Sequence, residues 1–211
     1  MSYGAKLAYQ SSESAATYEQ RPVYSGLLGK MRGKTERRAI AELVSGIDAG
    51  SIVLDCPCGN GRWFEALSAR AKRIVARDVS SGMAAHAATR SLPGVEIDVA
   101  VDDAENLDLA DGAVDYTFSF ALMKHLPIPV QYRVLGEFAR VSRKGVICSF
   151  AVIRPVSFAW WSFRKPAESY PVAHQELELM ARQAGMRLER IVKISQPLIG
   201  LEYFAVFAKA A

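Results

Sequence analysis

The residues best suited to bind a polar ligand are one acid and two glycines that follow a short apolar run. Residues 52–55 contain two β-branched side chains and end in Asp55, a pattern typical of a buried parallel strand. Gly59 and Gly61 follow in a turn, where the lack of a side chain lets a ligand approach the backbone. Residues 62–67 then carry apolar side chains at helical spacing. Strand, glycine turn and helix open a nucleotide-binding βαβ unit; a tight turn without a ligand is the alternative.

A second acid stands at the end of the next predicted strand. Residues 73–78 end in Asp78, which lies 17 residues beyond Gly61. In a parallel sheet the tip of this strand sits beside the glycine turn, where a carboxylate can accept both hydroxyl groups of a ribose. The alternative is that Asp78 caps the helix that starts near Ser80.

A third group of acids follows the alternating run at residues 95–101, which predicts a third strand. Residues 102–107, here called the acidic loop, should lie at the same edge of the sheet. An acid at that edge can accept a hydrogen bond from an exocyclic amine such as that of adenine. The alternative is a solvated acidic loop.

The elements that position these residues predict an α/β fold. Strands at 113–120 and 145–152 alternate with helices that begin near Pro129 and His174, and Ile40 to Ile47 form an earlier amphipathic helix. Two β-rich runs, 186–195 and 201–208, are separated by too few residues for a crossover helix and should pair as an antiparallel hairpin. The sequence therefore predicts a Rossmann-like three-layer sandwich with a mostly parallel seven-stranded sheet and a C-terminal antiparallel hairpin.

Composition sets broad limits on the class of protein. A chain of 211 residues, half of them apolar and 23% charged, is ordinary for one globular domain. No apolar run reaches the length of a membrane span, the first residues lack the apolar core of a signal peptide, and three cysteines form no disulfide framework. We therefore expect a cytoplasmic protein. A formal charge of +4 permits an anionic partner without requiring one.

Three segments invite more than one interpretation. Residues 1–20 are small and polar and suggest an arm or lid that orders on a ligand. The basic cluster at 30–38 is interpreted as a solvated helix face, with an anion- or RNA-binding patch as the alternative. The aromatic segment, residues 154–166, suits either a substrate lid or interfacial anchor, or a loop folded over its own aromatic side chains.

Four stretches in this order resemble the motifs of the class I S-adenosylmethionine-dependent methyltransferases, closest to the small-molecule subgroup that includes the ubiquinone and menaquinone methyltransferases. They are residues 53–61, 76–83, 103–107 and 114–119. The resemblance covers roughly residues 35–209 and implies an arm or lid at 1–34, a methyltransferase domain at 35–211 and an insertion at about 154–172. Pro57 and Arg77 depart from the family pattern, which usually has glycine and a small or apolar residue there.

The resemblance implies that S-adenosylmethionine is the cofactor and assigns residues to its parts. These are Tyr18 as a lid, Asp55, Gly59 and Gly61 at the methionine end, Asp78 on the ribose, Val79, Met83, Asp103 and Ala104 around the adenine, and Ser119 and Phe120 near the donor sulfur. The expected reaction is an in-line methyl transfer to an oxygen, nitrogen or carbon of a small-molecule acceptor. His125 is the candidate base where the acceptor must lose a proton; His86 and His174 have no assigned role.

Other functions fit the sequence less well. Cys56 and Cys58 have no partnered Cys/His pair for a zinc site, and Phe64 stands where a dehydrogenase fingerprint needs a small residue. A non-catalytic module that binds a cofactor or partner on the same fold stays open. The acceptor is aromatic, apolar or anionic; an RNA-modifying enzyme is disfavoured because no RNA-binding module is recognisable, and a lipid-linked substrate with peripheral membrane contact stays an alternative.

Overall fold

The computed structural model describes residues 26–153, 169–194 and 202–210. Three of the predicted features fall outside these ranges. They are the lid residue Tyr18, the whole of the aromatic segment, and the turn expected at 196–200.

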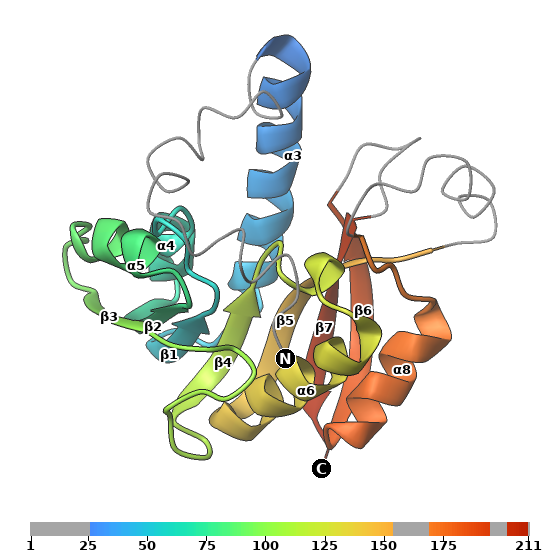
Figure 1. Ribbon diagram of the computed structural model, residues 1–211. Coiled ribbons are helices and arrows are strands. Elements are labelled where there is room, and N and C mark those ends of the chain that lie inside the picture. The colour runs from blue at the N-terminus through green and yellow to red at the C-terminus, as the bar shows by residue number, and fades with distance from the viewer. Residues whose placement is uncertain (1–25, 154–168, 195–201, 211) are drawn as a thin grey trace.

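A seven-stranded sheet forms the centre of the molecule, in the order β3-β2-β1-β4-β5-β7-β6 (Figure 1). Its strands are β1 (Ser51–Asp55), β2 (Ala71–Asp78), β3 (Glu96–Val101), β4 (Val114–Ser119), β5 (Ser142–Ala151), β6 (Met186–Lys193) and β7 (Glu202–Lys209). The first five pair in parallel, and β7 pairs antiparallel with both β5 and β6. The predicted fold class, including the C-terminal hairpin, is therefore confirmed.

The last strand lies inside the sheet rather than at its edge. β7 runs between β5 and β6, so β6 is the edge strand although it comes first in the chain. Gly145 on β5 permits this close pairing, because a Cβ atom there would stand 2.7 Å from the carbonyl oxygen of Phe207. The interior position of β7 agrees with its sequence, since Tyr203, Phe204 and Phe207 are all buried.

Helices cover both faces of the sheet and form two cores. They are α3 (Gly26–Ser45), α4 (Phe64–Ser68), α5 (Ser81–Ala88), the 3-10 helix η3 (Met123–His125), α6 (Ile128–Val141) and α8 (His174–Gln183). One core joins the sheet to α6 and α8, and the other joins it to α3, α4 and α5. Successive strand residues enter opposite cores, as with Val53 and Leu54, because side chains alternate along a strand.

The long helix α3 includes the basic cluster at 30–38, whose side chains are described from residue 33 onward. Lys34, Arg37 and Arg38 are exposed while Ile40 and Leu43 are buried, so this part of the cluster is a solvated face of an amphipathic helix. The helix runs without a break across residues 34 and 35, where the sequence suggested a boundary between arm and domain. Within the described ranges, no helix combines the length and the apolar character that crossing a bilayer requires.

Candidate functional site

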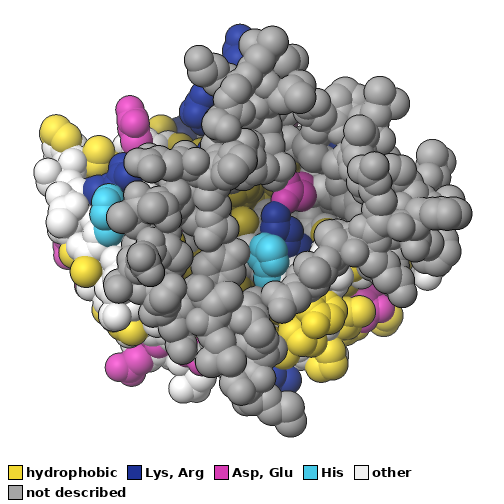
Figure 2. Space-filling view, turned by 45° about the horizontal axis from the view of Figure 1, so that its top comes forward, with side chains coloured by type: hydrophobic (Ala, Val, Ile, Leu, Met, Phe, Trp, Pro, Cys, Tyr) yellow, Lys and Arg dark blue, Asp and Glu magenta, His cyan; other side chains and the backbone are white. Residues whose placement is uncertain are grey.

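A cleft opens at the edge of the sheet where the parallel strands end. Four loops line it, which follow β1, β2, β3 and β4. Their lining residues are Cys56, Pro57, Cys58, Gly59, Asn60, Arg62, Trp63, Asp78, Val79, Met83, Asp102, Asp103, Ala104, Phe120, Ala121, Leu122, His125, Leu126 and Val134. The strand order reverses between β1 and β4, and ligands of open α/β sheets bind at such a switch point. Figure 2 brings this edge forward, and hydrophobic, basic, acidic and histidine side chains are visible near the centre of the view.

The two predicted glycines have different surroundings. Both adopt a positive φ, 54° at Gly59 and 76° at Gly61, which favours glycine at each position. A Cβ atom at Gly59 would meet nothing within 4 Å, whereas one at Gly61 would stand 2.6 Å from the ring of Phe64. Gly59 therefore leaves space at the cleft, and Gly61 allows Phe64 to pack beneath the turn.

Asp78 fixes the glycine turn through its carboxylate. One oxygen accepts the amide N–H of Gly59 at 2.8 Å and the other accepts that of Ser80 at 2.9 Å. The cap of α5 is Ser80, whose hydroxyl group accepts the N–H of Met83, so Asp78 is not the N-cap that the alternative interpretation required. Burial raises the pKa of Asp78, and the two N–H donors oppose that rise.

Asp55 is a buried carboxylate without a partner. It is fully buried at the end of β1, and neither oxygen has a hydrogen-bond partner among the described residues. Burial raises its pKa well above the usual range, and the negative charge of Asp78 adds to the rise. Asp55 does not line the cleft itself but precedes the three lining residues Cys56, Pro57 and Cys58. Such an orphaned acid is rare in folded proteins unless a ligand or a reaction uses it.

The acidic loop brings Asp102, Asp103 and Ala104 to the cleft. Asp103 accepts the N–H of Glu105 at 3.1 Å, and Asp102 accepts the N–H of Asp103 at 2.8 Å. The N–H of Asp102 in turn donates to the carbonyl oxygen of Asp78 at 3.0 Å, which joins the loop to the tip of β2. The loop is therefore held by local hydrogen bonds, while its residues 102–106 are half-buried or exposed.

The segment after β4 forms the remaining wall. Phe120, Ala121, Leu122 and His125 line the cleft, while Ser119 is buried and does not. Ala121 has a φ of 60°, an unusual value for a residue with a side chain, and its N–H donates to the hydroxyl oxygen of Ser149 at 2.7 Å. His86 and His174 lie on α5 and α8, away from this wall.

The two cysteines in the loop after β1 are expected to be unreactive. Cys56 and Cys58 are free and buried, and burial raises the pKa of both thiols, which keeps them protonated. No cluster of three or more metal-ligating side chains occurs among the described residues.

Sequence reasoning missed several lining residues that lie next to the motifs. They are Asn60, Arg62, Trp63, Ala121, Leu122, Leu126 and Val134. Trp63 meets Phe120 edge to face with ring centroids 5.3 Å apart, which joins the wall after β1 to the wall after β4. Aromatic and apolar side chains at helical spacing predicted burial in the core, and only the fold places them at a cleft.

Comparison with known proteins adds a family match. Residues 53–145 match the model of the family described as methyltransferase domain. The chain is 35% identical over 111 residues to a malonyl-[acyl-carrier protein] O-methyltransferase of Pectobacterium atrosepticum, which covers 50% of this chain and 40% of the relative. It is 36% identical over 118 residues to a demethylmenaquinone methyltransferase of Thermobifida fusca, covering 51% and 48%. The chain thus spans less than half the length of these curated relatives.

Solved structures with the same fold extend over almost the whole chain. The magnesium protoporphyrin IX methyltransferase of Synechocystis PCC 6803, solved with S-adenosylhomocysteine, aligns with a TM-score of 0.76 at 14% identity and covers 98% of this chain and 100% of that one. The PH0226 protein of Pyrococcus horikoshii aligns with a TM-score of 0.67 at 20% identity, covering 92% and 98%. At these identities the likeness establishes the fold.

Proposed function

We propose that the chain carries a class I S-adenosylmethionine-dependent methyltransferase domain and methylates a small-molecule acceptor. The observation that carries the proposal is the meeting of Gly59 and Asp78. The N–H of Gly59 lies 2.8 Å from the Asp78 carboxylate, and open space adjoins the glycine. Backbone that a ligand can approach, beside a buried acid at the next strand tip, fits a nucleoside.

Asp78 holds the ribose in this proposal. Each of its carboxylate oxygens already accepts one backbone N–H, and each retains a lone pair for a hydroxyl donor. The same bonds fix the direction of the carboxylate before a ligand arrives, which lowers the entropy cost of binding. Val79 and Met83 follow it along the cleft wall and pack against the adenine.

Asp55 and the glycine turn serve the methionine end. Two carboxylate oxygens without a partner among the described residues lie at the end of β1, just before a turn whose Gly59 leaves room for a ligand. A cationic ammonium group near this turn offsets the cost of the buried negative charge. Gly61 contributes by letting Phe64 support the turn from beneath.

The acidic loop and the wall after β4 complete the cofactor site. Asp103 accepts the adenine amine and the backbone of Ala104 borders the ring. Phe120 lies near the donor sulfur, with Ser119 buried behind it. Tyr18, which lies outside the described residues, acts as the lid.

When bound, S-adenosylmethionine supplies a methyl group already activated on a sulfonium. The protein therefore has to align the acceptor with that group and exclude water, and such positioning can supply roughly 7–11 kcal/mol of the barrier. His125 lines the same cleft and removes a proton where the acceptor nucleophile carries one.

The acceptor belongs to the class of small carbonyl or quinone-like molecules in this proposal. The relatives are named for a malonyl-[acyl-carrier protein] and for demethylmenaquinone, which are chemically unlike each other. The acceptor panel in the turnover assay below therefore includes both chemical classes.

Calorimetric titration with S-adenosylhomocysteine tests the cofactor site. We expect micromolar affinity that falls at least 100-fold in Asp78→Ala, because the ribose loses its acceptor and the N–H groups of Gly59 and Ser80 lose theirs. Asp48→Asn is the control, since Asp48 is an exposed acid that binds Lys144 outside the cleft. Absence of binding in the wild type contradicts the proposal.

Release of S-adenosylhomocysteine tests turnover. The wild type is incubated with S-adenosylmethionine and a panel of malonyl thioesters, quinols and phenols, and product is measured with and without each acceptor. With a protonated acceptor we expect His125→Gln to lower kcat by about 100-fold while the affinity for S-adenosylhomocysteine changes less than about twofold. Binding without turnover on any acceptor points instead to a non-catalytic module.

A further inference from the structure

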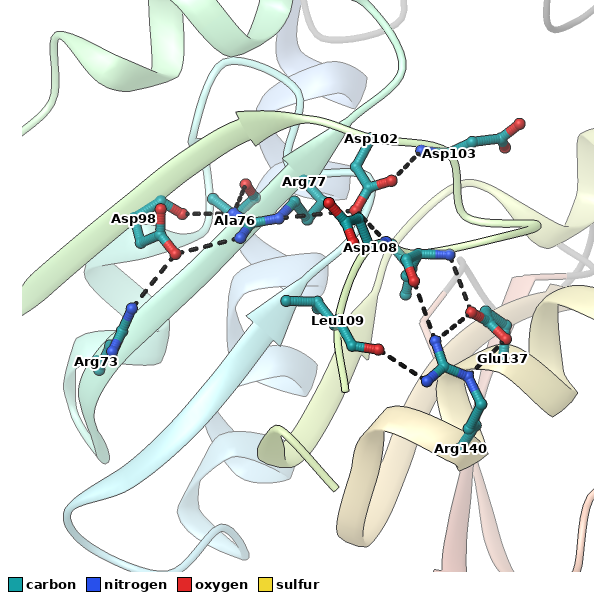
Figure 3. Close-up of polar contacts among 11 residues, drawn as sticks. Arg73, Ala76, Arg77, Asp98, Asp102, Asp103, Asp108, Leu109, Glu137 and Arg140 are labelled. Carbon is teal, nitrogen blue, oxygen red and sulfur yellow. Dashed lines mark hydrogen bonds and ion pairs between the residues drawn. The ribbon is translucent and has the colours of Figure 1, made fainter. Parts of the chain in front are cut away.

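Arg77 is a buried cation directly behind the cleft. It is 7% exposed, and its guanidinium group donates to the carbonyl oxygens of Ala76 and Asp98, each at 3.0 Å. It also pairs with the carboxylate of Asp98 at 3.2 Å and, through Nε, with that of Asp102 at 3.8 Å. Figure 3 shows the side chain lying between these two acids, one on β3 and one at the start of the acidic loop.

Arg77 and Asp78 together connect two loops of the site. The carbonyl oxygen of Arg77 accepts the N–H of Cys58, and the Asp78 carboxylate accepts that of Gly59. On the other side, the carbonyl oxygen of Asp78 accepts the N–H of Asp102, and the Arg77 guanidinium pairs with the Asp102 carboxylate. Each of the two residues therefore uses backbone and side chain to reach both the glycine turn and the acidic loop.

Asp102 connects Arg77 to the rest of the acidic loop through hydrogen bonds. One of its oxygens accepts the N–H of Asp103 at 2.8 Å, and the other, the oxygen paired with Arg77, accepts the N–H of Asp108 at 3.0 Å. The far end of the loop is bound to α6. There the Glu137 carboxylate accepts the N–H of Leu107, and Arg140 donates to the carbonyl oxygen of Leu107. The loop is thus fixed at both ends, as Figure 3 shows, and its first anchor depends on Asp102.

We propose that Arg77 is a positioning residue for adenine recognition: through Asp102 it orients the acidic loop so that Asp103 accepts the adenine amine. This inference rests on the proposed function of the cleft. The charge of Arg77 also allows Asp102 to lie with its side chain only 10% exposed near Asp78 and Asp103, because buried like charges need a nearby cation. Nothing in this role requires Arg77 to touch the cofactor, and it does not line the cleft.

The test compares two ligands that differ only at the adenine amine. S-adenosylhomocysteine and its purine analogue, in which a hydrogen atom replaces the amine, are titrated calorimetrically into each variant. We expect the wild type to prefer the adenine ligand by about 10-fold or more, the value of a hydrogen bond to a charged acceptor. Arg77→Gln should reduce this preference to less than about threefold, whereas Arg77→Lys should retain most of it.

Arg73→Gln is the matched control. Arg73 also pairs with the Asp98 carboxylate, at 3.4 Å, but it has no contact with Asp102 among the interactions described for it. A general loss of stability lowers the affinity for both ligands equally. Only the ratio of the two affinities therefore measures how well Asp103 is positioned. A ratio that stays at the wild-type value in Arg77→Gln overturns the proposal, as does an equal fall in Arg73→Gln. If Arg77→Gln does not fold, Asp102→Asn must lower the ratio in its place, and an unchanged ratio there overturns it.

Hydrogen exchange separates this inference from the function on which it rests. In the protein without ligand, the amides of Asp103 and Asp108 should exchange about 10-fold faster in Arg77→Gln than in the wild type, and unchanged in Arg73→Gln. Unchanged exchange in Arg77→Gln contradicts the anchoring role even where the wild type binds S-adenosylhomocysteine. If exchange is faster in Arg77→Gln but the wild type does not bind S-adenosylhomocysteine, Arg77 anchors the acidic loop and the proposed role in adenine recognition is wrong.

Discussion

At the scale of single residues, Asp55 shows how a buried acid without a partner opposes stability. Its carboxylate is fully buried, has no partner among the described residues, and has a raised pKa because of burial and the nearby Asp78 charge. An acid with a raised pKa in the folded state destabilises the protein increasingly as pH rises above the unfolded pKa near 3.8. Functional sites commonly carry such a cost.

Asp55→Asn should therefore stabilise the ligand-free protein. We expect an increase of about 1–3 kcal/mol in the free energy of unfolding at pH 7, small at pH 4 and growing with pH, together with weaker binding of S-adenosylhomocysteine. Urea unfolding between pH 4 and pH 8 measures the gain. Asp48→Asn is the contrast, because Lys144 and Tyr116 lower the pKa of Asp48 and its removal should give no gain with rising pH. A destabilised Asp55→Asn protein at pH 7 contradicts this account.

At the scale of elements, the turn between β1 and α4 contains two glycines that serve different purposes. Gly59 and Gly61 share a positive φ, yet one adjoins open space and the other adjoins a ring. The ring belongs to Phe64, the first residue of α4 and 1% exposed, so the helix packs against the turn through this side chain. The turn is consequently supported from beneath by packing and from the side by Asp78.

Alanine should mainly weaken ligand binding at Gly59 and mainly lower stability at Gly61. Gly59→Ala adds only the cost of a left-handed conformation, about 1–2 kcal/mol, but should weaken S-adenosylhomocysteine binding about 10-fold or more. Gly61→Ala forces Phe64 to move and should cost about 2–4 kcal/mol of stability, part of which Phe64→Leu restores.

Unfolding in urea and calorimetric titration on the same samples check both effects. Gly136→Ala on α6 is the control, because its Cβ meets nothing within 4 Å and a helix favours alanine. An equal loss of stability in Gly59→Ala and Gly61→Ala would contradict the difference in packing between the two positions.

At the scale of the whole molecule, the cleft joins the two halves of the sheet. Loops after β1, β2 and β3 form one wall and the segment after β4 forms the other, and the strand order reverses between β1 and β4. A ligand in this cleft contacts both halves, so its binding free energy adds to the stability of the entire domain.

Thermal unfolding with ligand measures this coupling. At S-adenosylhomocysteine concentrations of about 100 times Kd, the added stability is about 2.7 kcal/mol, which corresponds to a rise in Tm of roughly 5–10 °C for a domain of this size. Asp78→Ala should show little rise at the same concentration. An unchanged Tm in the wild type at saturation contradicts ligand binding to the folded domain.

The sequence by itself determined the elements and the edge at which the site lies. The apolar runs that form the parallel strands are bounded by polar residues, as at Asp55, at Asp78 and before Asp103, so local patterns were enough to predict strands whose tips meet at one edge. The short connection between the last two strands was enough to predict a hairpin, because geometry leaves no room for a crossover.

Only the tertiary structure decided the order of the strands in the sheet and the contacts between segments that are distant in sequence. The order of β6 and β7 depends on the pairing of Gly145 with β7, and the different uses of Gly59 and Gly61 depend on where Phe64 packs. Arg77 departs from the family pattern in sequence, and its contact with Asp102 appears only when β2 and the acidic loop lie side by side. Periodicity along a chain fixes which face a residue occupies, whereas contacts between distant segments depend on sheet order and register, which no local pattern encodes.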